Sequence, residues 1–147
     1  EGVVIVAAGD IVCGSASPPE PCVHQATSDT VLAIAPDAVL GLGDLQYETG
    51  DYADFMTYYD PTWGRFKAIT HPAPGNHEYQ GSASAAGYFD YFNGIGNQDG
   101  PAGERGKGYY SFDLGTWHII ALNSNCAAVD GCHAVGVRLS LVEALYD

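Results

Sequence analysis

The chain has 147 residues, of which 46% are hydrophobic and 16% are charged. This length and composition fit a single domain with its own core and argue against a disordered chain. The formal net charge of −13, from 18 acidic and 5 basic residues, is a poor basis for binding nucleic acid or an anionic membrane surface, since both require clustered Lys and Arg. No apolar run approaches the length of a membrane span.

Two apolar, β-branched runs predict buried strands, Val3 to Ala8 and Ala38 to Leu42. The first run is continuous, as is typical of a central strand that is covered on both faces. Between the two runs, apolar residues recur at helical spacing over residues 24–35, and Pro36 ends this predicted helix. These elements together predict a β-α-β unit with parallel strands.

Further elements are predicted along the rest of the chain. Residues 51–60 carry an aromatic stripe at helical spacing, which predicts a helix that faces the core. Residues 81–108 are rich in Gly, Asn and Ser and predict a long surface excursion with one short helix at its aromatic residues. Residues 108–113 and 117–122 predict a β-hairpin, and residues 138–146 a final helix. We expect no second domain.

Three short motifs follow predicted strands and carry most of the chemistry. They are Gly9-Asp10, then Gly43-Asp44-Leu45-Gln46-Tyr47, and then, after a weaker run at residues 68–70, Gly75-Asn76-His77-Glu78. In an open α/β sheet, ligands bind beyond the carboxyl ends of the parallel strands. We therefore expect the polar side chains of the three motifs to converge there. Carboxylate, phenolate and amide oxygens suit hard divalent or trivalent cations, and imidazole also serves iron and zinc.

A two-metal hydrolase needs a carboxylate that bridges both ions, and Asp44 on the middle strand is the natural bridge. Asp10 would serve one ion and Asn76 the other, while a turn would bring the Tyr47 phenol to the ion at Asp10. His77 would face the substrate and protonate a leaving alkoxide. For each aspartate taken alone, the alternative is a simple turn cap after a strand, and for Tyr47 the alternative is packing.

The three motifs, in this order, resemble those of the calcineurin-like metallophosphoesterase superfamily. The Gly-Asp-x-x-Tyr motif resembles the purple acid phosphatase-like branch of that superfamily. Many other members carry a histidine two residues after the first aspartate, where this chain has Val12, which again suggests that Tyr47 serves as a ligand. Residues 107–124 are similar to the strand pair of secreted bacterial members, and the resemblance covers about residues 3–126.

The resemblance implies an α/β fold in which a β-sandwich is flanked by helices. It implies a phosphoesterase that hydrolyses phosphate monoesters or diesters with a metal-bound hydroxide at a binuclear site. Asp10, Asp44 and Tyr47 would hold a ferric-type ion, and Asp44 with Asn76 a partner ion of iron, zinc or manganese. His77 would contact the phosphate. The implied partner is a small phosphate ester, with no protein partner evident.

The chain departs from the superfamily toward its end. The superfamily completes its site with later histidines, one in a separate motif and then a Gly-His-x-His sequence. After Asn76 this chain has only His77, His118 and His133, and it diverges from the family after Cys132. We therefore interpret residues 1–147 as a single, partial domain that resembles the first half of the fold. The alternative function is a catalytically incomplete fragment with weak or no metal binding. A dinucleotide-binding domain is discounted, because no G-x-G-x-x-G turn follows the first strand.

The four cysteines form two close pairs, Cys13 with Cys22 and Cys126 with Cys132. In an exported protein such pairs predict two local disulfides, which favours an extracellular or periplasmic location. Zinc binding is the alternative, although neither pair has the short C-x-x-C spacing of zinc knuckles. His24, beside the first pair, is expected at the surface. The chain begins at Glu1 without a signal peptide, and we interpret it as a mature or trimmed product.

Overall fold

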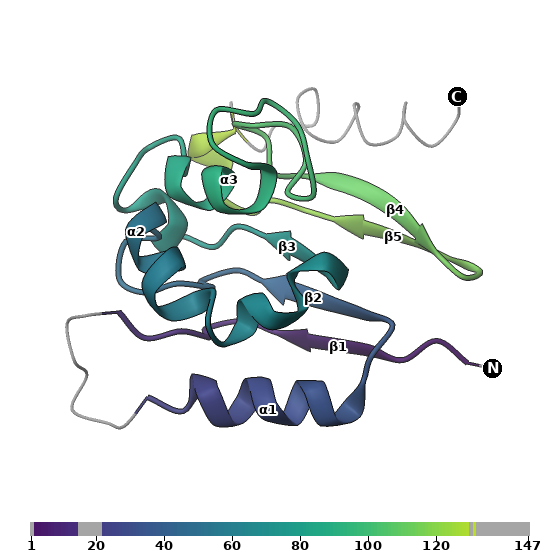
Figure 1. Ribbon diagram of the computed structural model, residues 1–147. Helices are drawn as coiled ribbons and strands as arrows, with labels where there is room; N and C mark the ends of the chain where they lie inside the picture. Colours follow the sequence, from purple (N-terminus) through teal and green to yellow (C-terminus); the bar gives the residue numbers. More distant parts are fainter. Residues whose placement is uncertain (1, 15–21, 130, 132–147) are drawn as a thin grey trace.

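The computed structural model describes residues 2–14, 22–129 and 131 of the chain. Three parallel strands form one sheet in the order β1 (Ile5–Ala8), β2 (Ala38–Leu42) and β3 (Thr70–Ala73). Helix α1 (His24–Ile34) connects β1 to β2 and lies beside β1 (Figure 1). This arrangement confirms the predicted β-α-β unit and the middle position of β2. Among the described helices, none has the length and apolar character that crossing a membrane requires.

Strand β1 differs from its prediction in length and in burial. Regular pairing starts at Ile5 rather than at Val3, and exposed residues alternate with half-buried ones along the strand. Val6 and Ala8 line the same cavity as Thr27 and Val31 of α1, so one face of β1 is turned toward that helix. Ile5, on the opposite face, is 38% exposed. The prediction of a strand covered on both faces is therefore wrong, because only one face of β1 packs against a helix.

The segment after the second motif is helical, as predicted, but it is not a regular α-helix. Helix α2 (Tyr52–Asp54) continues directly into the π-helix η1 (Phe55–Tyr59) and is followed by the 3₁₀ segment η2 (Trp63–Ile69). The predicted aromatic stripe does face the core, since Phe55 and Tyr59 are fully buried.

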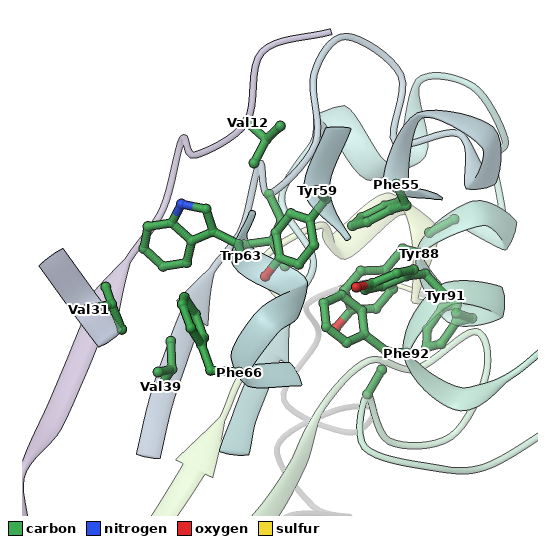
Figure 2. Close-up of a cluster of buried hydrophobic side chains, with 14 residues drawn as sticks. Val12, Val31, Val39, Phe55, Tyr59, Trp63, Phe66, Tyr88, Tyr91 and Phe92 are labelled. Atoms are coloured by element: carbon green, nitrogen blue, oxygen red, sulfur yellow. The ribbon is translucent and has the colours of Figure 1, made fainter. Parts of the chain in front are cut away.

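Helix α3 (Ala86–Asn93) confirms the short helix predicted within residues 81–108. Its side chains meet those of η1 in an aromatic cluster (Figure 2), which comprises Phe55, Tyr59, Tyr88, Phe89, Tyr91 and Phe92. The Phe55 and Tyr91 rings stack with their centroids 4.9 Å apart. The Tyr88 hydroxyl donates to the Pro72 carbonyl of β3 at 3.0 Å. The cluster therefore fixes α3 against the strand that leads into the third motif.

The predicted hairpin is confirmed as β4 (Tyr110–Leu114) and β5 (Trp117–Ala121), an antiparallel pair in a second sheet. It lies beside β3 (Figure 1), where the Phe112 ring stacks on His71 at 3.6 Å between centroids. Two short 3₁₀ segments, η3 (His77–Tyr79) and η4 (Cys126–Ala128), complete the described elements. The fold is mixed α/β, and the predicted final helix lies outside the described residues.

Candidate metal centre

The three motifs follow β1, β2 and β3, and the first two run side by side beyond the sheet. The Asp10 N–H donates to the Gly43 carbonyl at 3.1 Å, and the Tyr47 N–H donates to the Val12 carbonyl at 2.8 Å. Asp10 and Asp44 both adopt left-handed backbone conformations, with φ of 54° and 49°. Such conformations are costly for residues other than glycine and gather at functional sites. Two neighbouring strand ends therefore each present an aspartate in a strained turn.

The side-chain oxygens of Asp10, Asp44 and Tyr47 come together in a group that we call the oxygen cluster. The Tyr47 hydroxyl donates to Asp10 Oδ1 at 2.5 Å and lies 3.4 Å from Asp44 Oδ2. Burial raises the pKa of the Tyr47 phenol, and the hydrogen bond to Asp10 and the charge of Asp44 raise it further. A phenolate ligand would therefore form only if a cation replaced the phenolic proton.

His77 is held against the oxygen cluster by both its backbone and its ring. Its N–H donates to Asp44 Oδ1 at 2.9 Å, and its ring centroid lies 4.3 Å from that of Tyr47. Nδ1 lies 2.6 Å from the Glu48 carbonyl oxygen, which can only accept, so Nδ1 carries a proton. Nε2 is then the ring nitrogen that remains for other contacts.

Asn76 lies near the oxygen cluster because it precedes His77, whose N–H donates to Asp44. Its side chain is exposed, and within the described residues no hydrogen bond joins it to Asp10, Asp44 or Tyr47. The two other histidines that the structure describes after β2 lie elsewhere. His71 stacks on Phe112, and His118 of β5 pairs with Asp113 at 2.7 Å on the hairpin. The remaining histidine, His133, lies outside the described residues.

Glu78 ties the second motif to the third through its carboxylate. Oε1 accepts the N–H groups of Leu45 and Gln46 at 2.8 and 3.3 Å, and Oε2 those of Asp44 and Gly75 at 3.0 and 2.6 Å. Burial raises the pKa of Glu78, and the N–H donors oppose that shift. The bond from Gly75 is local, as expected for Glu78, whereas the bonds from the second motif cross up to 34 residues of sequence and are not indicated by the third motif.

Two motif glycines allow the loops to approach this closely. A Cβ at Gly75 would overlap the Asp44 carboxylate and backbone nitrogen. Gly43 has φ of +95°, and a Cβ there would lie 2.8 Å from Gly75 Cα. Glycine is therefore required at both positions for steric reasons, since any side chain would force the second and third loops apart.

The donor set fits a hard cation at the oxygen cluster. Two carboxylates and a phenol converge there, and Asp10 is exposed while Asp44 and Tyr47 are half-buried. An ion could therefore reach these oxygens from solvent, and its charge would relieve the repulsion between the two carboxylates. A second ion could be held by Asp44, acting as a bridge between the two ions, and by the nearby Asn76.

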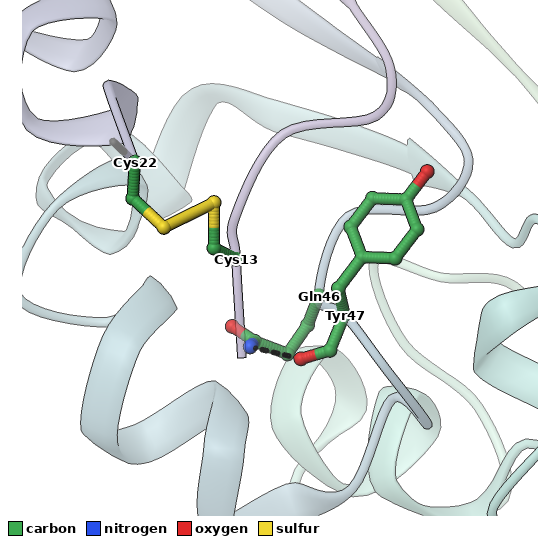
Figure 3. Close-up of a disulfide and its surroundings, with 4 residues drawn as sticks. All are labelled: Cys13, Cys22, Gln46 and Tyr47. Atoms are coloured by element: carbon green, nitrogen blue, oxygen red, sulfur yellow. Dashed lines mark hydrogen bonds between the residues drawn. A yellow bond between two sulfur atoms is a disulfide. The ribbon is translucent and has the colours of Figure 1, made fainter. Parts of the chain in front are cut away.

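The first cysteine pair is joined next to this site. Cys13 and Cys22 form a disulfide with 6.0 Å between their Cα atoms (Figure 3), which confirms the predicted pairing. The loop of Cys13 contacts the candidate centre, since Cys13 follows the Val12 carbonyl that accepts the Tyr47 N–H. Cys126 is also disulfide-bonded, and Cys132 lies outside the described residues. A disulfide fits an oxidising compartment.

No protein-family model matches the chain, and a comparison with curated proteins found no significant match. The geometry of the site therefore carries the functional argument.

Proposed function

We propose that this chain is a metal-dependent phosphoesterase whose centre is the oxygen cluster. The supporting observation is the meeting of Asp10, Asp44 and Tyr47 at the ends of adjacent parallel strands. Turn caps alone do not account for this geometry. Two acidic side chains in strained turns share one phenol, which costs folding energy through repulsion and strain unless a cation binds.

Different residues of the site would bind the metal ions and transfer the proton. Asp10, Tyr47 and Asp44 would hold one ion, and Asp44 and Asn76 would hold a second. When bound, the cations supply positive charge for the phosphate and an acidified water molecule as nucleophile. That charge is needed because the chain carries a net charge of −13, which repels a phosphate ester.

His77 serves as the general acid for the leaving group. Its Nδ1 proton is held by the Glu48 carbonyl, and the Glu48 carboxylate lies 4.0 Å from the same ring nitrogen. The opposite ring nitrogen, Nε2, would carry the proton that passes to the leaving group. We also propose that the protein has the β-sandwich of the metallophosphoesterases and that it is secreted. The hairpin beside β3 and the Cys13–Cys22 disulfide support these two points.

The competing function is a non-catalytic metal-binding fragment. It is favoured by the exposed Asn76 side chain and by the positions of His71 and His118 on the strands, away from the oxygen cluster. In that case the oxygen cluster holds a single ion and the second position lacks ligands.

Phosphate release from a chromogenic monoester tests the proposal. The protein is assayed with added manganese, iron or zinc, beside Asp44→Ala and the matched control Asp113→Ala, which removes an exposed carboxylate on β4. We expect activity in the wild type and the control and its loss in Asp44→Ala. Equal rates for the wild type and Asp44→Ala would remove the enzyme claim. Calorimetric binding of metal without any turnover would establish the fragment instead.

A further inference from the structure

Three metal-ligating side chains meet at the disulfide, apart from the oxygen cluster. Cys13 follows the extension of β1, and Cys22 and His24 lie at the start of α1. The ligand atoms of these three residues all lie within 4.8 Å of one another. In the part of the chain that the structure describes, no other group of three His, Cys, Asp or Glu side chains meets so closely.

His24 is not the surface residue that its sequence position suggests. It is half-buried, and its Nδ1 atom is shielded from solvent without a hydrogen-bond partner among the described residues. Buried polar atoms are rarely left unpaired, so this nitrogen calls for an explanation.

We propose that reduction of the Cys13–Cys22 disulfide turns this cluster into a zinc site, with two thiolates and the His24 Nδ1 atom as ligands. In a tetrahedral zinc site, bond lengths of about 2.3 Å to sulfur and about 2.0 Å to nitrogen place the two sulfurs roughly 3.8 Å apart and each sulfur roughly 3.5 Å from the nitrogen. The ligand atoms of the three residues lie within 4.8 Å of one another, so a site of this size requires only a local shift once the disulfide opens. A water molecule would fill the fourth position.

A small thiol can serve as the reductant that opens the Cys13–Cys22 disulfide. Two thiol molecules give up two electrons and two protons to the Cys13–Cys22 bond, forming one external disulfide and two protein thiols. Zinc binding then releases two protons, as both thiols become thiolates. An external disulfide reverses the sequence by reoxidising the pair and expelling the ion. Zinc and the protein disulfide are therefore mutually exclusive.

The zinc site does not depend on the proposed phosphoesterase activity, because its ligands differ in kind. Sulfur and imidazole favour zinc and other borderline or soft ions, whereas carboxylate and phenolate favour hard ones. Metal at the oxygen cluster would produce no thiolate-to-metal absorption, so the two sites can be distinguished by spectroscopy.

Cobalt titration of the full chain tests the inference, because Co²⁺ takes the place of Zn²⁺ and makes thiolate ligation visible. The protein is reduced anaerobically with a phosphine, and an oxidised sample is titrated in parallel. We expect intense thiolate-to-cobalt bands in the reduced protein only, and their loss when Zn²⁺ is added. Absence of these bands after reduction, or equal bands in the oxidised sample, would overturn the inference.

Single substitutions test which side chains bind the metal ion at this site. We expect His24→Gln to weaken cobalt binding at least about 10-fold and to alter the bands, since it removes a direct ligand. His118→Gln, at an exposed histidine of β5, is the matched control and should bind as the wild type does. Cys13→Ser should abolish the bands, whereas Cys126→Ser should retain them. Wild-type affinity in His24→Gln, or persistent bands in Cys13→Ser, would refute the assignment.

Discussion

Replacing Glu78 by alanine would remove the acceptor of four backbone N–H groups in the second and third motifs. The bonds from Leu45 and Gln46 are buried, whereas those from Asp44 and Gly75 are partly accessible to water. Two buried donors left unpaired cost about 1–3 kcal/mol each, so we expect a loss of roughly 2–6 kcal/mol in the free energy of unfolding. That is a large share of the stability of an ordinary domain.

Glu78→Gln is the milder form of the same change. Its amide oxygen can still accept from Leu45 and Gln46, but its NH₂ group would then face the N–H groups of Asp44 and Gly75. Those two donors are partly accessible to water, so we expect the smaller loss of about 1–3 kcal/mol. Metal affinity should fall as well, because the Asp44 backbone loses its fixed position.

Urea unfolding followed by circular dichroism measures both variants. Glu104→Gln is the matched control, since its side chain is 56% exposed and forms a surface ion pair with Lys107, and we expect little change. If Glu78→Ala retained its free energy of unfolding to within about 1 kcal/mol, the four bonds would not hold the loops together and our reasoning would fail.

Three further predictions concern Gly75 of the third motif, His24 of α1 and the Cys13–Cys22 disulfide. Gly75→Ala should lose about 1–3 kcal/mol of stability together with metal affinity, because its Cβ overlaps Asp44; unchanged calorimetric metal binding would contradict this. The lowered pKa of His24 gives stability that is present above the ordinary value of 6.5 and lost as the pH falls through the folded value. Urea unfolding from about pH 5 to about pH 8 should therefore show a smaller dependence on pH in His24→Gln than in the wild type, and equal slopes would count against it. Replacing both Cys13 and Cys22 by serine opens a link of sequence separation 9 and should cost about 2–3 kcal/mol in the oxidised protein; identical melting curves would show that the link contributes nothing.

Local sequence patterns predicted most of the elements that the structure describes. Strand β2 begins and ends where its apolar run does, because Pro36 stops the preceding helix and Gly43 turns the chain. The hairpin follows from two β-prone runs around Gly115. The meeting of Asp10, Asp44 and Tyr47 was also predictable, since the ends of neighbouring parallel strands lie at one edge of a sheet.

Features that depend on long-range contacts were not predictable. Glu78 bonds to backbone groups more than 30 residues away, and no local pattern encodes such a contact. Burial of the His24 ring nitrogen depends on how α1 packs near the disulfide, whereas a polar residue beside a loop suggests only exposure. The partial exposure of Ile5 has the same origin, because an apolar run does not reveal which of its faces meets a helix.

Ferric ion titration followed by visible absorption tests the oxygen cluster most directly. Bound Fe³⁺ should displace the Tyr47 proton, and the resulting phenolate would give a charge-transfer band. We expect this band in the wild type, its absence in Tyr47→Phe, and much weaker binding in Asp44→Ala. No band in the wild type, or an undiminished band in Tyr47→Phe, would contradict a cation site formed by these three side chains.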